Sequence, residues 1–128
     1  MKAFRAADAP ARPADPMTFS GAATTARLAA DSTGTPVHVY RVEFAPGSRT
    51  RWHMHSGPQW LFVTDGRVRA QTLGADAIDL NTGDVVVFAP NEKHWHGAAP
   101  GASGAHLAFN VNLTTEWLEP VTDTEYGA

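Results

Sequence analysis

The fold of this chain is decided by the stretch Gly47–Gly66, whose sequence is GSRTRWHMHSGPQWLFVTDG. His53 and His55 are separated by one residue, and residues i and i+2 of a β-strand point to the same face. Two imidazoles placed in this way can approach one metal ion together. The Gly-Pro turn that follows can bring Gln59, on a neighbouring strand, to the same place. The stretch therefore predicts a mononuclear metal site inside a β-barrel.

A second histidine pair, His94 and His96, repeats the same spacing later in the chain. Burying four histidines without partners would cost free energy, whereas a divalent cation uses neutral imidazole as a ligand. The two pairs together therefore favour a metal centre over an ordinary packed core. A lone strand histidine such as His38 is expected to be a satisfied core residue or a surface group.

Composition narrows the class of protein. The chain has 128 residues, 43% of them apolar and 18% charged, which predicts one globular domain. A net charge of −3 gives no reason to expect nucleic acid as a partner. There is no cysteine, so any metal must be held by nitrogen and oxygen ligands. No apolar run is long enough for a signal peptide or a membrane span, so a cytoplasmic location without membrane contact is expected.

The order of turns and apolar runs predicts an all-β protein. Residues 1–17 contain three prolines and are expected to be an extended arm, followed by a single domain over residues 18–128. Asp65-Gly66 predicts a hairpin, and residues 114–119 predict one helical turn. About ten short strands separated by Gly/Pro turns are typical of a sandwich or barrel. The clearest predicted strands cover residues 37–44, 49–55, 59–64, 67–72, 78–80, 85–88, 94–96 and 105–113.

Two motifs resemble those of the cupin family. The pattern G-x5-H-x-H-x3-Q-x6-G over residues 47–66 is similar to the first cupin motif, and GDVVVFAPNEKH over residues 83–94 is similar to the second. The resemblance covers most of the chain and implies a double-stranded β-helix, or jelly-roll barrel, with a metal ion in its mouth. The ligands implied by the resemblance are His53, His55, Gln59 and His94.

The sequence is more similar still to a subgroup, the bacterial manganese-dependent cupin hydroxynitrile lyases. The shared features are EKHWHGAAP at residues 92–100, the ending from Trp117 to Tyr126, and glutamine where most cupins have glutamate. This resemblance implies one divalent metal ion per chain. Mn(II) is expected first and Fe(II) next, because hard octahedral geometry with open positions suits both, while Zn, Ni and Co remain open.

Gln59 decides which chemistry the expected ion favours. Three neutral imidazoles and a neutral amide leave the charge of a divalent cation uncompensated by the protein. Such a site favours Lewis-acid work on an anionic or alkoxide ligand. The usual iron triad of two histidines and one carboxylate is absent, which lowers the expectation of oxygen chemistry.

Further site residues follow from strand faces. His96 shares its face with His94, so it is expected to look into the same cavity without binding the metal. On the last strand His106 and Asn110 share a face that would form a polar pocket wall. The alternative turns the opposite, apolar face inward and leaves His106 in solvent. In the predicted strand 37–44, Tyr40 and Val42 lie on one face, which would line the pocket.

The function expected from these residues and the resemblance is that of a metal-dependent lyase acting on a small organic substrate. His96 would act as general acid or base, with His106 and Asn110 orienting the substrate or the leaving group. Cleavage of a cyanohydrin would give an aldehyde and cyanide. Tyr40 is larger than the residue expected at its place in the lyases, so it would narrow the pocket or supply a phenol as an acid. The alternatives are an Fe- or Mn-dependent dioxygenase of an aromatic or alkene substrate, and a non-catalytic ligand-binding cupin.

Large aromatic residues fall on the strand faces opposite the predicted ligands. Trp52, Trp60, Phe62 and Trp95 are expected to pack sheet against sheet or to cover a subunit interface. Two tryptophans on an outer face would form a sizeable exposed apolar patch. A homo-oligomer, a dimer or higher, is therefore expected.

Overall fold

The structure is a computed structural model, and it describes residues 1–127. Within these residues the chain forms twelve β-strands, one 3-10 turn and one short α-helix. The elements are η1 Ala6–Asp8, β1 Arg12–Pro13, β2 Phe19–Ser20, β3 Ala23–Asp31, β4 Val37–Phe44, β5 Arg49–Thr50, β6 His53–His55, β7 Gln59–Thr72, β8 Ile78–Asn81, β9 Val85–Phe88, β10 His94–Ala98, β11 Gly104–Val111, β12 Thr115–Trp117 and α1 Asp123–Tyr126.

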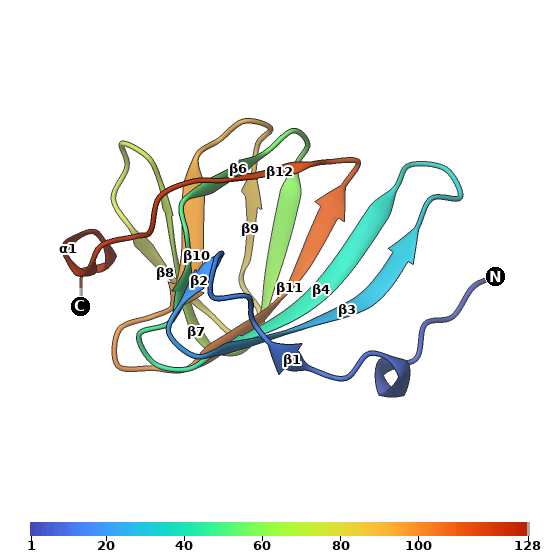
Figure 1. Ribbon diagram of the computed structural model, residues 1–128, viewed down its shortest axis with the longest axis horizontal. Coiled ribbons are helices and arrows are strands. Elements are labelled where there is room, and N and C mark those ends of the chain that lie inside the picture. The colour runs from blue at the N-terminus through green and yellow to red at the C-terminus, as the bar shows by residue number, and fades with distance from the viewer. Residues whose placement is uncertain (128) are drawn as a thin grey trace.

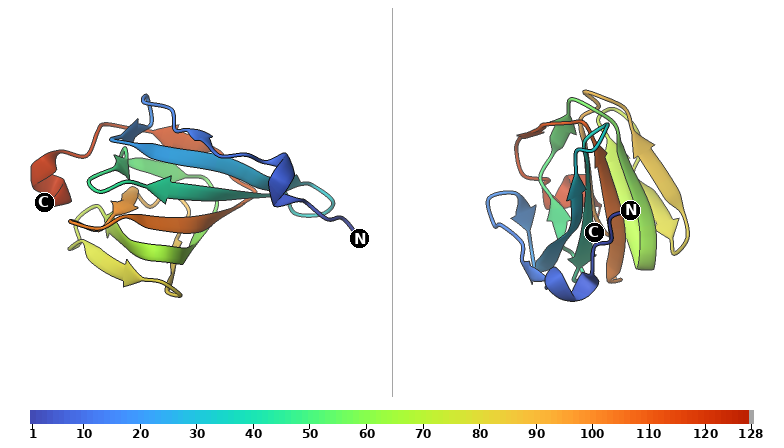
Figure 2. Two further views of the ribbon diagram at one scale, coloured as in Figure 1. Left: turned by 90° about the horizontal axis from the view of Figure 1, so that it is seen from below. Right: turned by 90° about the vertical axis from the view of Figure 1, so that its right-hand side faces the viewer.

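All strand pairs are antiparallel, and the sheet curls into a half-barrel (Figure 1). The main path runs β1-β3-β4-β11-β7-β10-β5-β2, with β8 and β9 paired to β7, and with β12 paired to β6 and β6 to β10. Figure 2 shows the two curved layers that result, with the short helix α1 outside one end. The predicted all-β jelly-roll fold is confirmed.

Strand β7 connects the two layers, because it continues through the expected hairpin at Asp65-Gly66. Residues 59–62 pair with β9, whereas residues 67–70 pair with β8. Gly66 has a φ of 60°, and a Cβ there would lie 2.1 Å from the carbonyl oxygen of Ser103. The Asp-Gly signal thus marks a bend at a close backbone approach. The predicted hairpin is wrong.

Replacement of Gly66 by alanine is expected to lower the free energy of unfolding by about 2–3 kcal/mol, because the methyl group would meet a backbone oxygen in a left-handed conformation. Gly74 is the matched control, since its φ is 84° but a Cβ there meets nothing within 4 Å. Gly74→Ala should therefore cost only about 1 kcal/mol. Guanidinium unfolding curves measure both values. Equal losses for the two variants would contradict the steric role of Gly66.

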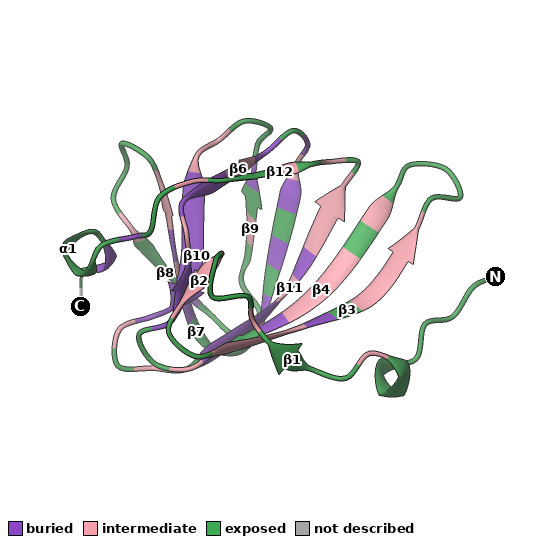
Figure 3. Ribbon diagram, in the orientation of Figure 1, coloured by how far each residue is buried: buried purple, intermediate pink, exposed green. Residues whose placement is uncertain are grey.

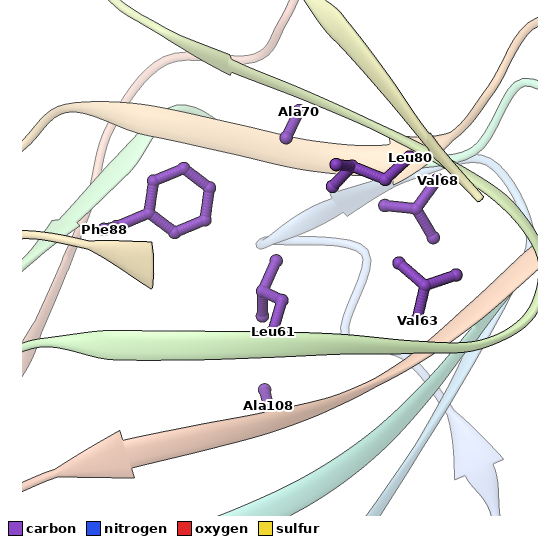
Figure 4. Close-up of a cluster of buried hydrophobic side chains, with 7 residues drawn as sticks. All are labelled: Leu61, Val63, Val68, Ala70, Leu80, Phe88 and Ala108. Atoms are coloured by element: carbon purple, nitrogen blue, oxygen red, sulfur yellow. The ribbon is translucent and has the colours of Figure 1, made fainter. Parts of the chain in front are cut away.

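The side chains of β7 point alternately to the inner and the outer face of the sheet, and this alternation helps to place the site. Gln59, Leu61 and Val63 are buried, while Trp60 and Phe62 are exposed. Burial follows the same alternation along β7 and is continuous along β10 (Figure 3). The main apolar cluster lies between the layers (Figure 4) and consists of Leu61, Val63, Val68, Ala70, Leu80, Phe88 and Ala108.

The segment after β11 forms a strand where the sequence predicted a helical turn. β12 pairs with β6, so that Trp117 lies opposite His53 and Thr115 opposite His55. The free edge of β6 offers this segment backbone partners that a single helical turn lacks. The helix α1 comes later and begins with a capping box formed by Thr122 and Glu125.

The aromatic residues divide into two groups. Trp52 and Trp95 are buried against Val121 and Tyr126 of the C-terminal segment, so they do not cover an exposed face. Arg49 holds this segment in place, since its Nη2 donates to the Val121 carbonyl at 2.7 Å.

Trp60 and Phe62 remain 47% and 41% exposed on the outer face of β7, beside Val85 and Val87 of β9. This outer face is apolar, as expected for a subunit contact. The expected homo-oligomer stays a prediction.

The N-terminal residues lie along the edge of the sheet. β1 pairs with β3, with Arg12 opposite Thr25, and the preceding residues contain only the 3-10 turn η1. The division between the expected arm and the domain, at residues 17 and 18, stays a prediction. No helix in residues 1–127 is long and apolar enough to cross a membrane.

Candidate metal centre

Three buried histidines meet at the contact of β6 with β10. His53 and His94 lie opposite each other in the ladder, and their ring centroids are 4.3 Å apart. Together with His96 they offer nitrogen atoms that all lie within 4.8 Å of one another. The i, i+2 spacing of His94 and His96 places both on the inner face of β10. The group is therefore close enough to hold a metal ion.

Backbone carbonyls fix which nitrogen of two histidines carries hydrogen. His53 Nδ1 lies 2.8 Å from the carbonyl oxygen of Arg51, and His94 Nδ1 lies 2.7 Å from that of Glu92. A carbonyl oxygen only accepts, so each Nδ1 donates and each Nε2 is left with a lone pair when the ring is neutral. His55 Nδ1 lies 2.8 Å from the hydroxyl oxygen of Thr115. These are the outer partners that metal-binding histidines require.

Gln59 turns an oxygen toward the same place. Its Nε2 donates to Asn110 Oδ1 at 2.8 Å, which leaves Oε1 at 3.2 Å from His94 Nε2. Two acceptors therefore face each other with no hydrogen between them. The Nε2 atoms of His53 and His55 are also buried without a partner. Lone pairs that converge in a buried place are satisfied by a cation, so these residues fit a divalent metal ion.

Burial keeps the imidazoles neutral. It lowers the pKa of His94 to about 4. The pKa of His53 is held well below its ordinary value by burial first and by nearby His94 second, and burial also lowers the pKa of His55. Neutral imidazole is the form that binds metal ions, so the site is ready for a cation at neutral pH.

The group opens into a cavity of about 300 Å³ inside the barrel. Its wall includes most of the predicted site residues: Tyr40, His53, His55, Gln59, His96, His106 and Asn110. The last strand thus turns its His106 face inward, and Phe109 lies on the other face. A larger groove of about 640 Å³ lies outside β3 and β4, but no histidine lines it.

A sequence model of the cupin domain matches residues 40–111, which is more than half of the chain. The chain belongs to the cupin family. Over 88 residues this cupin is 48% identical to an (R)-mandelonitrile lyase of Granulicella tundricola, covering 66% of this chain and 67% of that protein. The predicted resemblance to hydroxynitrile lyases is thereby confirmed.

Solved structures agree on the fold. A cupin-like protein of Thermotoga maritima superimposes with a TM-score of 0.85 at 40% identity, covering 89% of each chain. The polyketide cyclase RemF of Streptomyces resistomycificus superimposes with a TM-score of 0.75 over 98% of this chain and 90% of its own. The second protein is 17% identical, so its likeness shows the cupin fold alone.

The tightest histidine group of this cupin differs from the predicted ligand set in one member. The ring of His55 lies 5.0 Å from that of His53 and 5.3 Å from that of His94, while His96 takes its place in the closest group. His96 Nδ1 lies 2.9 Å from His106 Nε2, and both rings are buried. The ligand set His53, His55, Gln59 and His94, with His96 outside it, stays a prediction.

Several cavity residues escaped the sequence reasoning. Thr50 accepts a hydrogen bond from the His96 backbone N–H at 3.2 Å, and Trp117 packs on the His53 ring with centroids 4.6 Å apart. Trp117 is revealed only by the register of β12 on β6. The residues missed in the cavity wall are Phe19, Thr25, Thr50, Thr115 and Trp117.

Proposed function

We propose that this cupin is a metal-dependent lyase that cleaves a cyanohydrin to an aldehyde and cyanide. The observation that carries the proposal is the contact between His96 and His106 in the cavity beside the histidine group. This contact supports His96 as a buried neutral base beside the proposed donor set, which contains no carboxylate. The 48% identity to a protein named (R)-mandelonitrile lyase supports an aryl cyanohydrin as substrate.

The donor set of His53, His55, Gln59 and His94 suits Mn(II) first and Fe(II) next. When bound there, such an ion supplies Lewis acidity that favours loss of the proton from a substrate hydroxyl. The chain itself offers a wall of aromatic side chains, Phe19 and Trp117, at the cavity. These rings can pack on the organic part of the substrate and keep the hydroxyl toward the histidines.

In the proposed mechanism His96 moves the proton. Its Nε2 has no partner, while its Nδ1 is held by His106. In the proposed step Nε2 takes the hydroxyl proton, the electron pair of the broken O–H bond forms the second C–O bond of the aldehyde, and the C–C bond breaks so that cyanide leaves with its electron pair. Burial holds the pKa of His96 well below its ordinary value, so the protonated ring readily passes the proton on to cyanide. Tyr40 and Asn110 line the same cavity, and in the proposed step they hold the leaving group.

Replacement of His96 by alanine tests this role. Cleavage of mandelonitrile by the manganese-loaded variant is expected to fall at least about 100-fold, because the proton acceptor is gone. Benzaldehyde formation is followed by absorbance, and elemental analysis is expected to show the metal still bound. Unchanged turnover would remove His96 from the mechanism. Loss of the metal would show that His96 is itself a ligand, as the closest histidine group allows.

The second candidate is an Fe- or Mn-dependent dioxygenase of an aromatic or alkene substrate. It is supported by the group of three imidazoles, His53, His94 and His96, which suits iron as well as manganese. Oxygen consumption by the iron-loaded protein distinguishes the two functions, since cyanohydrin cleavage needs no oxidant. Binding without turnover in both assays would favour a ligand-binding cupin.

A further inference from the structure

The amide of Gln59 has two chemically different ends, and only one of them can bind a cation. Oε1 offers lone pairs, whereas the Nε2 group offers hydrogens that repel positive charge. Rotation of the amide by half a turn exchanges the two ends with little change in shape. The value of Gln59 to the site therefore depends on whatever fixes this rotation.

The imidazole of His94 favours the Nε2 end of the Gln59 amide, which is the end that cannot bind a cation. His94 Nε2 carries a lone pair, because its Nδ1 donates to the Glu92 carbonyl at 2.7 Å. A Gln59 amide turned the other way would donate from Nε2 to this lone pair and satisfy both groups. That arrangement would place amide hydrogens where the cation binds.

Asn110 opposes this rotation from the neighbouring strand. Gln59 and Asn110 lie directly opposite each other in the ladder of β7 and β11, on the inner face. Gln59 Nε2 donates to Asn110 Oδ1 at 2.8 Å, and Gln59 itself is only 4% exposed. Water therefore has little access to replace Asn110 as the acceptor. The contact leaves Oε1 turned toward His94, at 3.2 Å from its Nε2.

We propose that Asn110 is a positioning residue that holds the carbonyl oxygen of Gln59 toward the metal and so sets the affinity of the site. The inference rests on the metal centre proposed above and gives Asn110 a role beyond contact with substrate. It acts by preorganisation, since the site is held ready for a cation at the expense of a hydrogen bond between Gln59 and His94.

Two variants of similar size separate this role from simple packing. Asn110→Leu removes the acceptor, whereas Asn110→Asp keeps an acceptor oxygen at the same place. Loss of an outer partner typically weakens metal binding about 10–100-fold, so Asn110→Leu is expected to lose this much affinity for Mn(II). Asn110→Asp is expected to bind Mn(II) at least as tightly as the unchanged protein. Mn(II) dissociation constants from the electron paramagnetic resonance signal of free Mn(II) provide the measurement.

A double-mutant cycle with Gln59→Ala completes the test. If Asn110 acts through Gln59, the double variant binds Mn(II) no more weakly than Gln59→Ala alone, and the Co(II) absorption spectrum of Asn110→Leu resembles that of Gln59→Ala. Additive losses, or wild-type affinity in Asn110→Leu, would overturn the proposal. Asn110→Ala replaces the leucine variant if thermal melting shows that leucine disturbs the fold. Failure of the unchanged protein to bind Mn(II) or Co(II) would instead overturn the metal centre itself, and the role of Asn110 with it.

Discussion

His53→Ala is expected to lose bound metal and the proposed lyase turnover together. His53 is fully buried at the centre of the histidine group, and its Nε2 has no partner within the protein. It belongs both to the predicted ligand set and to the closest group of three histidines. The affinity for Mn(II) should therefore fall by more than the roughly 10- to 100-fold that loss of an outer partner costs. Elemental analysis and isothermal titration provide the measurement.

Two further exchanges identify the remaining ligands. If the predicted set is right, His55→Ala weakens metal binding and His96→Ala does not. The opposite result would assign the third imidazole to His96, which the closest group contains. Retention of full metal affinity in His53→Ala would contradict both sets.

The metal-free protein is expected to unfold in mild acid. Burial lowers the pKa of His94 and of His106 from the ordinary 6.5 to about 4. The unfolded chain therefore binds more protons than the folded chain between these values, and stability falls as the pH drops from about 6.5 to about 4. A pKa difference of this size corresponds to roughly 3 kcal/mol for each group. Other buried histidines act in the same direction.

Circular dichroism of chelator-treated protein at a series of pH values measures this effect as a falling melting temperature. His38→Gln is the control, because His38 is exposed on β4 and its exchange should leave the curve unchanged. Added Mn(II) should oppose the loss, since it binds only the neutral imidazoles. A melting temperature that stays constant between pH 6.5 and pH 4 would contradict the account.

Strand periodicity made most of the site predictable from sequence. Residues two apart on a strand share a face, and this alone placed His53 with His55 and His94 with His96. The same rule put His106 and Asn110 on one face of the last strand, and the structure turns that face inward. The fold followed from the turn spacing and from the resemblance of the two histidine motifs to those of cupins.

Other features depend on contacts between distant segments, which local patterns do not report. The Asp65-Gly66 pair carries the same local signal in a hairpin and in a bent strand, and the carbonyl of Ser103 decides between them. The strand β12 forms because β6 has a free edge. Ring tautomers and the rotation of the Gln59 amide likewise need the positions of acceptors on other elements, such as Asn110 on β11.

The pairing of β12 with β6 also bears on how the protein matures. Thr115 supplies the hydroxyl that holds His55, and Trp117 supplies the ring that packs on His53. Both lie some sixty residues further along the chain than the histidines they contact. During synthesis the ribosome therefore releases the motif His53-Met54-His55 well before its partners. In a nascent chain the contacts that hold His55 and pack on His53 therefore form only after residues 115–117 have emerged, so the packing of the histidine group is completed late in synthesis.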